Sequence, residues 1–362
     1  MNKRELKLSK FTLFSLLFFA SSIFILIISK LNKQFADFFN VKISSVFRLV
    51  LADISRSFPF SLAELLVFLS PIIITLVIIA NVKKRNVSVS LYLSRIISFF
   101  LIFFSLYVFS FGIGYHTEDF YDRFGIKKED ASLTDLKNTA MIIASRLNTT
   151  NDLINYDSDN FSVMPYDIST LNKKLNIGYK VICEKYSFMN DQRSKIKPVL
   201  MSKTLSRAHI TGLYSFFTGE VNINLDFPDY TIPYTVAHEF AHQRGIARED
   251  EANIVAFLVC INSSDEYLKY SALINAFEYV TSALNEASPE AFYEVYATLD
   301  EQIKKELHAY SDFYKKYENS TSGKIGTKIG NAYLMLNGET EGVRSYGLVA
   351  ELLVAYFDGK IG

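Results

Sequence analysis

Two histidines and a glutamate near the middle of the chain are spaced for metal-assisted hydrolysis. The run His238-Glu239-Phe240-Ala241-His242 places its histidines four residues apart. On a helix such positions share one face, so both imidazoles can bind one metal ion while Glu239 borders the same cavity as a general base. The chain has only 5 histidines in 362 residues, so this pairing is improbable by chance. The pattern predicts a zinc hydrolase with His238 and His242 as ligands and Glu239 as catalytic base.

A catalytic zinc also needs a third protein ligand and one open position. Gly245 allows a sharp turn after the first helix, and an apolar helical pattern resumes near Arg248. On this second helix Glu249 and Asn253 are four residues apart, so we expect Glu249 to bind the metal and Asn253 to orient a ligand histidine. Glu251 lies about 200° around the helix from Glu249. This favours Glu249 as the ligand and leaves Glu251 for solvent or for Arg248.

These residues resemble the gluzincin branch of the zincin metallopeptidases, in which a Glu-x-x-small-(Asp or Asn) motif follows the His-Glu-x-x-His helix. The resemblance implies His238, His242 and Glu249 as ligands of one zinc ion, Glu239 as base and Asn253 as orienting residue. The linker departs from that pattern, because gluzincins usually place many more residues between the second histidine and the glutamate. A metzincin pattern fails, since its third histidine would fall at Arg248.

The whole run from His238 to Asn253 is closer still to a family of bacterial membrane proteins known as domain of unknown function 3810. Other stretches are similar to that family as well: residues 54–65 with Pro59-Phe60-Ser61, residues 211–224 with Gly212-Leu213-Tyr214 and Gly219-Glu220-Val221-Asn222, and residues 342–347. The resemblance covers nearly the whole chain. It implies a membrane-anchored, zincin-like protein and no particular substrate.

The first third of the chain predicts a membrane anchor. Residues 11–29, 58–80 and 91–115 are nearly free of charge, and each is about as long as the roughly 20 residues that a membrane-spanning helix requires. We therefore expect three transmembrane helices within residues 1–115. The fold class is a mainly α membrane protein.

Basic residues near the spans predict the orientation. Lysines and arginines precede the first span and fill the second loop, whereas the segment after the third span opens with acidic residues. The positive-inside rule then places the amino terminus in the cytoplasm and residues after 115 outside it. The basic first loop is the opposing signal. Its charges alternate with apolar residues, which is typical of an amphipathic helix on the outer membrane surface.

Residues 116–362 are long enough for one further domain with its own core. Apolar residues at helical spacing predict helices over 132–147, 168–188, 265–285, 298–317 and 343–357. Strand character is confined to 198–205 and 213–225. The prediction is a mostly helical, zincin-like α+β domain with a small hairpin or sheet before the metal-site helix. Its last strand is either a place where an extended peptide adds to the sheet or an ordinary hairpin.

For four further residues the sequence allows a functional role and an ordinary structural one. His209 and Tyr346 are candidates for polarising a substrate carbonyl or stabilising an oxyanion, although a lone histidine or tyrosine is more often packed or exposed. Cys183 and Cys260 either form a disulfide or stay reduced, and the apolar position of Cys260 favours a buried thiol. A net charge of zero without basic stripes argues against nucleic-acid binding.

The sequence therefore supports a multi-pass protein of the cytoplasmic membrane that hydrolyses amide bonds outside the cytoplasm. Its expected partners are the lipid bilayer and a peptide or protein substrate, with a cell-wall peptide crosslink as a variant. The alternative is a catalytically inactive, zincin-like sensor or interaction module. A transporter is disfavoured, because the apolar segments hold no paired polar residues.

Overall fold

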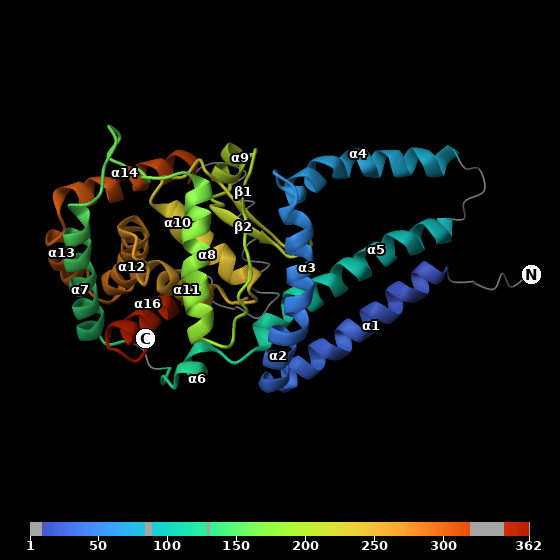
Figure 1. Cartoon of the computed structure of the whole chain (residues 1–362), viewed down its shortest axis with the longest axis horizontal. Helices are drawn as coiled ribbons and strands as arrows, with labels where there is room; N and C mark the ends of the chain where they lie inside the picture. The colour runs from blue at the N-terminus through green and yellow to red at the C-terminus, as the bar shows by residue number, and fades with distance from the viewer. Residues whose placement is uncertain (1–8, 84–88, 129–130, 319–343, 362) are drawn as a thin grey trace, which may run out of the picture.

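The computed structural model describes residues 9–83, 89–128, 131–318 and 344–361. Three long helices, α1 (Lys10–Leu31), α4 (Leu62–Lys83) and α5 (Val89–Ser110), project from one side of a larger helical body, as Figure 1 shows. Helix α1 begins at the far end of this projection, whereas the last described helix, α16 (Arg344–Phe357), lies in the body (Figure 1). The expected mainly α architecture is confirmed.

Helices α1 and α5 pack against each other through small polar residues. Ser15, Ser22 and Ser29 are buried along α1, and Ser22 Oγ lies 3.3 Å from Ser105 Oγ of α5. The large apolar side chains of both helices point outward; Phe14 and Phe24, for example, are 58% and 65% exposed. Small residues inside and large apolar ones outside are the arrangement of helices that pack in lipid.

Two described helices, Lys10–Leu31 and Ser90–Ser110, are long and apolar enough to cross a membrane. The third expected span corresponds to α4, in which the apolar stretch is the shorter Leu62–Val77. The structure therefore supports two of the three expected spans. Helix α4 starts after residue 58 because the Ser61 hydroxyl caps it, accepting the Glu64 N–H at 2.9 Å. Helix α5 ends at Ser110, and a 3₁₀ turn, η2 (Gly112–His116), follows it.

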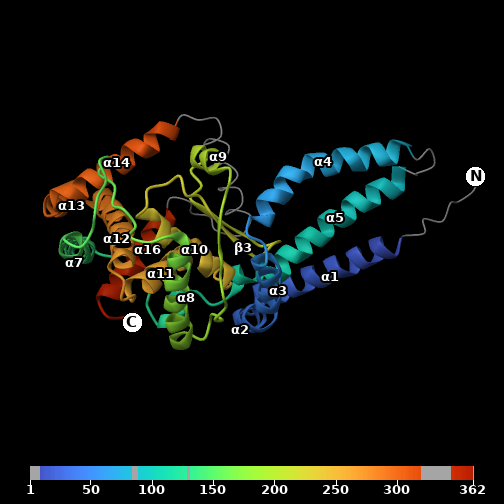
Figure 2. The same ribbon diagram turned by 45° about the horizontal axis from the view of Figure 1, so that its top comes forward.

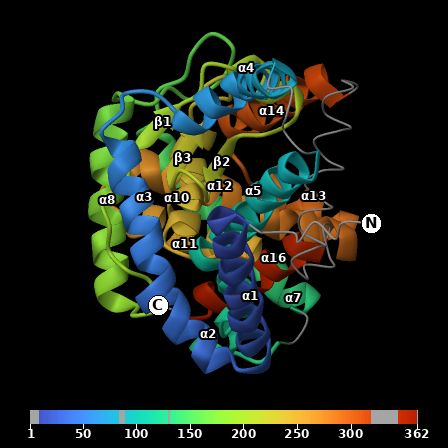
Figure 3. The ribbon, with the colours of Figure 1, turned by 90° about the vertical axis from the view of Figure 1, so that its right-hand side faces the viewer.

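The loop between the first two apolar segments is helical. It forms α2 (Lys33–Phe39), a π-helical turn η1 (Asn40–Ser44) and α3 (Ser45–Arg56), which crosses the base of the projecting helices (Figures 1 and 3). One face of α3 is buried, including Arg48 at 1% exposure. The other carries Val46, Val50 and Ile54, each more than half exposed. The expected amphipathic helix is present, and its polar face packs on protein.

The body contains one three-stranded sheet in the order β1-β3-β2. Strands β1 (Ile196–Pro198) and β3 (Glu220–Ile223) are parallel, and β2 (Gly212–Ser215) runs antiparallel to β3. The small sheet expected before the helix of His238 and His242 is confirmed. The strand expected over 198–205 is wrong beyond Pro198, the last residue of β1, because the N–H groups of Leu200 and Met201 bind the Glu64 carboxylate. Helix α9 (Ser202–Arg207) follows instead.

Helices pack against the sheet and form most of the core. Helix α12 (Glu266–Ala287) lies among α7 (Leu133–Asn151), α10 (Thr231–Gln243), α11 (Glu249–Ile261) and α16 (Arg344–Phe357). Among the described residues, the body also contains α6 (Phe120–Phe124), α8 (Ile168–Lys185), α13 (Pro289–Ala297) and α14 (Glu301–Glu318), and Figure 2 shows α8 and α14 on the outside. The helices expected from periodicity are therefore present, and the Ser132 hydroxyl caps α7 as expected. The expected division at residue 115 stays a prediction.

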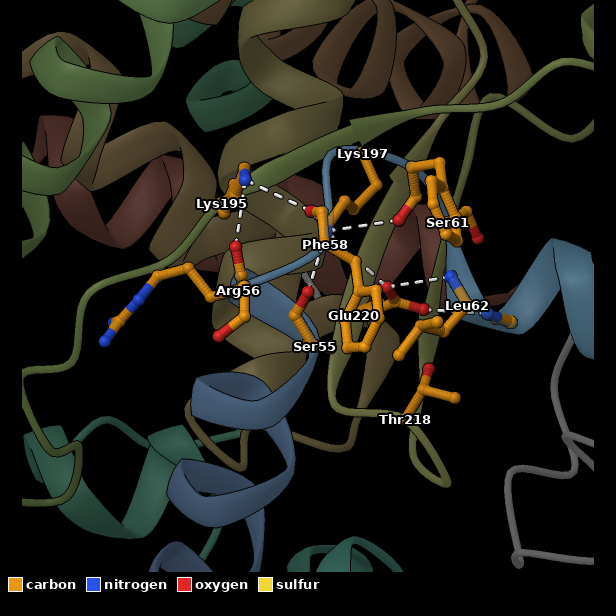
Figure 4. A network of polar contacts seen from close by, with 12 residues as sticks. Ser55, Arg56, Phe58, Ser61, Leu62, Lys195, Lys197, Thr218 and Glu220 are labelled. Atoms are coloured by element: carbon orange, nitrogen blue, oxygen red, sulfur yellow. Dashed lines mark hydrogen bonds and ion pairs between the residues drawn. The ribbon is translucent and has the colours of Figure 1, made fainter.

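A buried ion pair fixes the corner between α3 and α4 to the sheet (Figure 4). Lys197 Nζ lies 3.7 Å from the Glu220 carboxylate, and both side chains are at most 1% exposed. The ammonium group donates to backbone carbonyls at the end of α3, including that of Ser55 at 2.9 Å. The carboxylate accepts the N–H groups of Leu62 and Ala63 at the start of α4. Each charge thus stabilises the helix end whose dipole it complements, and α4 is held directly on strand β3.

Candidate metal centre

Helix α10 is held on the core by nearly its whole surface. Val236, Ala237, Phe240 and Ala241 are fully buried, and the Tyr179 hydroxyl donates to the Ala237 carbonyl. His238 and His242 lie one turn apart on the remaining face, with ring centroids 4.6 Å apart. The helix therefore fixes both histidines without help from a metal.

A tight turn brings the next helix back onto this face. Gly245 has φ +93°, a conformation that L-residues with a side chain rarely adopt. Helix α11 begins at Glu249, so the Glu249 carboxylate lies in the first turn. Glu249 Oε2 is 3.1 Å from His238 Nε2, and Glu249 Oε1 is 3.5 Å from His242 Nε2. The ligand atoms of His238, His242 and Glu249 all lie within 4.8 Å of one another.

Hydrogen bonds to the far ring nitrogens orient both histidines. His238 Nδ1 lies 3.0 Å from Asn253 Oδ1, and His242 Nδ1 lies 2.7 Å from the Ile246 carbonyl oxygen. Both partners are acceptors, so each Nδ1 donates a proton to them, and Nε2 is the nitrogen turned toward Glu249. A ring held in this way binds a metal through Nε2 once that nitrogen carries no proton. Asn253 occupies the orienting position expected for it.

Glu239 lies beside this cluster in a buried position. Glu239 is only 6% exposed. Burial raises the pKa of its carboxyl group, although His238 and His242 oppose the shift. Its carboxylate accepts the Tyr214 N–H of strand β2. A Cβ atom at Gly212 of the same strand would lie 2.8 Å from Glu239 Cγ and 2.9 Å from Oε1, so only glycine lets the strand approach so closely.

Glu251, the other candidate ligand, faces away from the cluster. It is buried and pairs with Arg248 at 2.7 Å, and it accepts the Phe120 N–H at 3.1 Å. Burial raises the pKa of Glu251 to about 7, although Arg248 opposes the shift. The structure thus brings Glu249, and not Glu251, to the two histidines. Arg248 was the basic partner expected for Glu251.

The cluster binds protons tightly when no metal is bound. Burial alone would lower the pKa of His242, but the nearby Glu249 carboxylate outweighs it and raises that pKa to about 9. The Glu249 carboxyl is partly shielded from solvent, which would raise its pKa, but His242 and His238 outweigh this and hold its pKa well below the usual range. At pH 7 His242 therefore carries a proton, and Glu249 is ionised.

We expect zinc affinity to rise with pH for this reason. Zinc needs neutral His242, so binding below pH 9 must release about one proton, and the association constant should grow about tenfold per pH unit up to the pKa of His242. Competition titrations with a zinc chelator of known affinity between pH 6.5 and 9 measure this slope. An affinity that stays constant over this range would contradict the assignment of His242 as a ligand.

Arg48 holds the turn between the two site helices, although it lies about 200 positions upstream. Its guanidinium donates to the carbonyls of Asn40, Ser110 and Arg244 and to Asn40 Oδ1, at 2.9–3.4 Å. Asn40 Nδ2 in turn donates to the Gly245 carbonyl at 3.0 Å. Arg48 thus fixes the chain just before Ile246, whose carbonyl orients His242.

We expect Arg48→Met to destabilise the protein and weaken its site. The substitution leaves several buried carbonyls without a donor, which costs on the order of 3 kcal/mol of unfolding free energy. Urea unfolding in detergent measures the loss, and chelator competition should show weaker zinc binding. The control is Lys42→Met, an exposed residue of the same loop, which should change neither value. Equal stability of the two variants would show that Arg48 does not hold the turn.

The two remaining site candidates do not join the cluster. His209 has φ +57° and stacks on Tyr314 of α14 at 4.1 Å, and no described contact links it to His238, His242 or Glu249. Tyr346 falls in the first turn of α16, and its side chain lies outside the described residues. Cys183 and Cys260 are both free, and Cys260 is fully buried, as the apolar position predicted.

Phe111 is a site neighbour that the sequence did not indicate. It directly follows α5, and its ring lies 5.7 Å from that of His242, edge to face. Phe111 also packs on Tyr214 of β2. Phe111, Arg48 and Gly212 all reach the site through contacts with residues far away in the sequence. The spacing of residue types along the chain does not predict such contacts.

These observations define a mainly helical protein with two helices fit to cross a membrane and a His-His-Glu cluster on the adjoining body. The chain belongs to the family described as "Protein of unknown function (DUF3810)", which matches residues 38–354. The match runs from α2 to α16 and includes the whole cluster. The predicted family is confirmed. No curated protein and no solved structure gives a significant match.

Proposed function

We propose that this protein is a membrane-anchored, zinc-dependent metallopeptidase with a zincin-like site. The observation that carries the proposal is the convergence of His238, His242 and Glu249 within 4.8 Å, beside the buried carboxylate of Glu239. Two imidazole nitrogens and one carboxylate oxygen form a donor set that suits catalytic zinc. The side chains of His238 and Glu249 are 14% and 32% exposed, so the cluster is open to solvent.

Each residue has a distinct role in the proposed reaction. When bound, zinc supplies a Lewis acid and lowers the pKa of a coordinated water to about 7. Glu239 accepts the proton of the attacking water and returns it to the leaving amine, and its raised pKa suits a group that both takes and gives a proton. Asn253 and the Ile246 carbonyl keep His238 and His242 in the binding tautomer.

Strand β2 is the part of the sheet best placed to hold a peptide. It is an edge strand, and Gly212 brings it against Glu239. An extended substrate that adds to this edge would bond to backbone groups beside the base. A peptide or protein is therefore the proposed substrate, and one zinc ion per chain is the proposed cofactor.

We place the protein in the cytoplasmic membrane, with α1, α4 and α5 all crossing it, so that α4 returns the chain to the cytoplasmic side between the other two. The outward-facing phenylalanines of α1 and the small polar seam between α1 and α5 support this placement. The basic residues before α1 favour a cytoplasmic amino terminus, which leaves the body with its cluster outside the cytoplasm.

Cleavage of a peptide mixture tests the proposal. The full-length protein in detergent is incubated with peptides of randomised sequence, and new termini are identified by mass spectrometry. We expect cleavage that a zinc chelator stops and added zinc restores. A protein that binds one zinc ion yet leaves every peptide intact would favour the alternative, a non-catalytic metal-binding module.

A further inference from the structure

Successive residues of the edge strand β2, beside Glu239, direct their backbone polar groups alternately toward β3 and away from it. The Asn224 N–H donates to the Thr211 carbonyl at 2.9 Å, so these residues form a hydrogen-bonded pair of the β2–β3 hairpin. Hydrogen-bonded and non-hydrogen-bonded pairs alternate along an antiparallel ladder. The backbone N–H and C=O groups of Leu213 therefore point toward β3, and those of Gly212 point away from β3. An extended substrate paired with Gly212 would follow the direction of β2.

Strand β2 runs from Glu239 toward the apolar helix α5. After Ser215 the chain forms the tip of the hairpin, where the Phe216 ring lies 5.1 Å from that of Phe103 and 5.2 Å from that of Tyr107. The Phe217 ring lies 5.7 Å from that of Phe103. The Ser110 hydroxyl donates to the Phe216 carbonyl at 3.3 Å. Contacts at several levels of α5 hold the tip along this helix.

Phe103 lies inside the apolar stretch Ser90–Ser110. At a rise of 1.5 Å per residue it is roughly 10 Å from the end of α5 at Ser110. The hairpin tip therefore lies beside the apolar stretch of α5 and not only beside its carboxyl end. Helix α3 crosses close to the end of α5, and its exposed Val46, Val50 and Ile54 suit the membrane surface.

The cluster of His238, His242 and Glu249 lies near the carboxyl end of α5. Phe111, the residue after α5, contacts His242. From Gly212 to Phe216 the strand covers about 13 Å at about 3.3 Å per residue. A polypeptide that followed β2 away from the cluster would thus reach the apolar helix α5 after only a few residues.

We propose that the natural substrates are membrane-anchored polypeptides, cut in the extended segment that leaves the bilayer. This inference rests on the proposed peptidase function and on α5 crossing the membrane. The geometry places the scissile bond within about ten residues of the substrate's membrane segment. Ten extended residues cover roughly 30 Å, which is more than the about 13 Å from Gly212 to Phe216. A soluble peptide of the same sequence lacks this placement and binds less.

The test uses full-length protein in phosphatidylethanolamine and phosphatidylglycerol vesicles. One substrate library carries a randomised ten-residue segment directly after a single transmembrane helix. A second places a 30-residue Gly/Ser spacer between helix and segment, and a third is the free segment. We expect cleavage of the first library at least tenfold faster than of the second or third. The spaced library is equally membrane-bound, so it controls for concentration at the vesicle surface.

Binding without turnover gives an independent readout. In Glu239→Gln, a photoreactive residue replaces Leu213, which is 54% exposed on β2. We expect crosslinks to the directly anchored library near its membrane helix and at least tenfold fewer to the others. Equal cleavage and crosslinking of the free segment would overturn the inference and leave the peptidase intact. Cleavage of none of the libraries by zinc-loaded wild type would overturn the proposed function itself.

Discussion

Replacing Glu249 by glutamine should weaken zinc binding more than any change outside the cluster. The substitution removes the negative charge that lies 3.1 Å and 3.5 Å from the two histidine nitrogens, and an amide oxygen is a poorer zinc ligand. Loss of a residue that merely orients a ligand costs roughly 10–100-fold in affinity, and we expect Glu249→Gln to exceed this range. Chelator competition on the full-length protein measures it.

Glu251→Gln is the matched control for this prediction. The two glutamates are two positions apart on α11, yet Glu251 pairs with Arg248 and does not face the cluster. We expect its zinc affinity to stay within about threefold of wild type, while unfolding shows a loss of stability from the weakened buried pair. If Glu251→Gln lost zinc and Glu249→Gln kept it, the assignment of the third ligand would be wrong.

Glu239→Gln should abolish hydrolysis and leave zinc binding intact. Glutamine has nearly the same shape as glutamate, so it fits against Gly212, but it does not accept a proton. Removal of a general base typically costs 10²–10⁴-fold in rate, and we expect about this loss with the randomised peptides. Zinc affinity should change little, because Glu239 is not among the three clustered ligands.

Glu286→Gln, an exposed residue of α12, controls for the loss of one negative charge and should hydrolyse as wild type does. Unchanged hydrolysis by Glu239→Gln would rule out Glu239 as the base. Hydrolysis that persists in Glu239→Gln and also resists a zinc chelator would point to a contaminating peptidase.

The helix pair of the site could be predicted from the sequence because its geometry is local. Positions four apart share a helix face, so the placement of His238 with His242, and of Glu249 with Asn253, follows from spacing alone. Gly245 signals the turn that folds the second helix back. Even the choice of Glu249 over Glu251 needed only the rotation per residue of a helix.

The support of the site could not be predicted, because it comes from contacts between distant parts of the chain. Asn40 and Gly245 are 205 positions apart, and periodicity does not report such a pair. Arg48 has the sequence context of a membrane-surface residue, and only the fold shows that its guanidinium binds the turn between α10 and α11. The expected strand over 198–205 failed for a similar reason, since the distant Glu64 binds the N–H groups that a strand would have used.

Metal content of the purified protein tests the central claim most directly. The full-length wild type, prepared without chelator, is measured by mass spectrometry for zinc per chain beside the double variant His238→Ala/His242→Ala. We predict close to one zinc ion per chain in wild type and almost none in the double variant. Wild type without zinc, or equal zinc in both proteins, would contradict the assignment of His238, His242 and Glu249 as a zinc site.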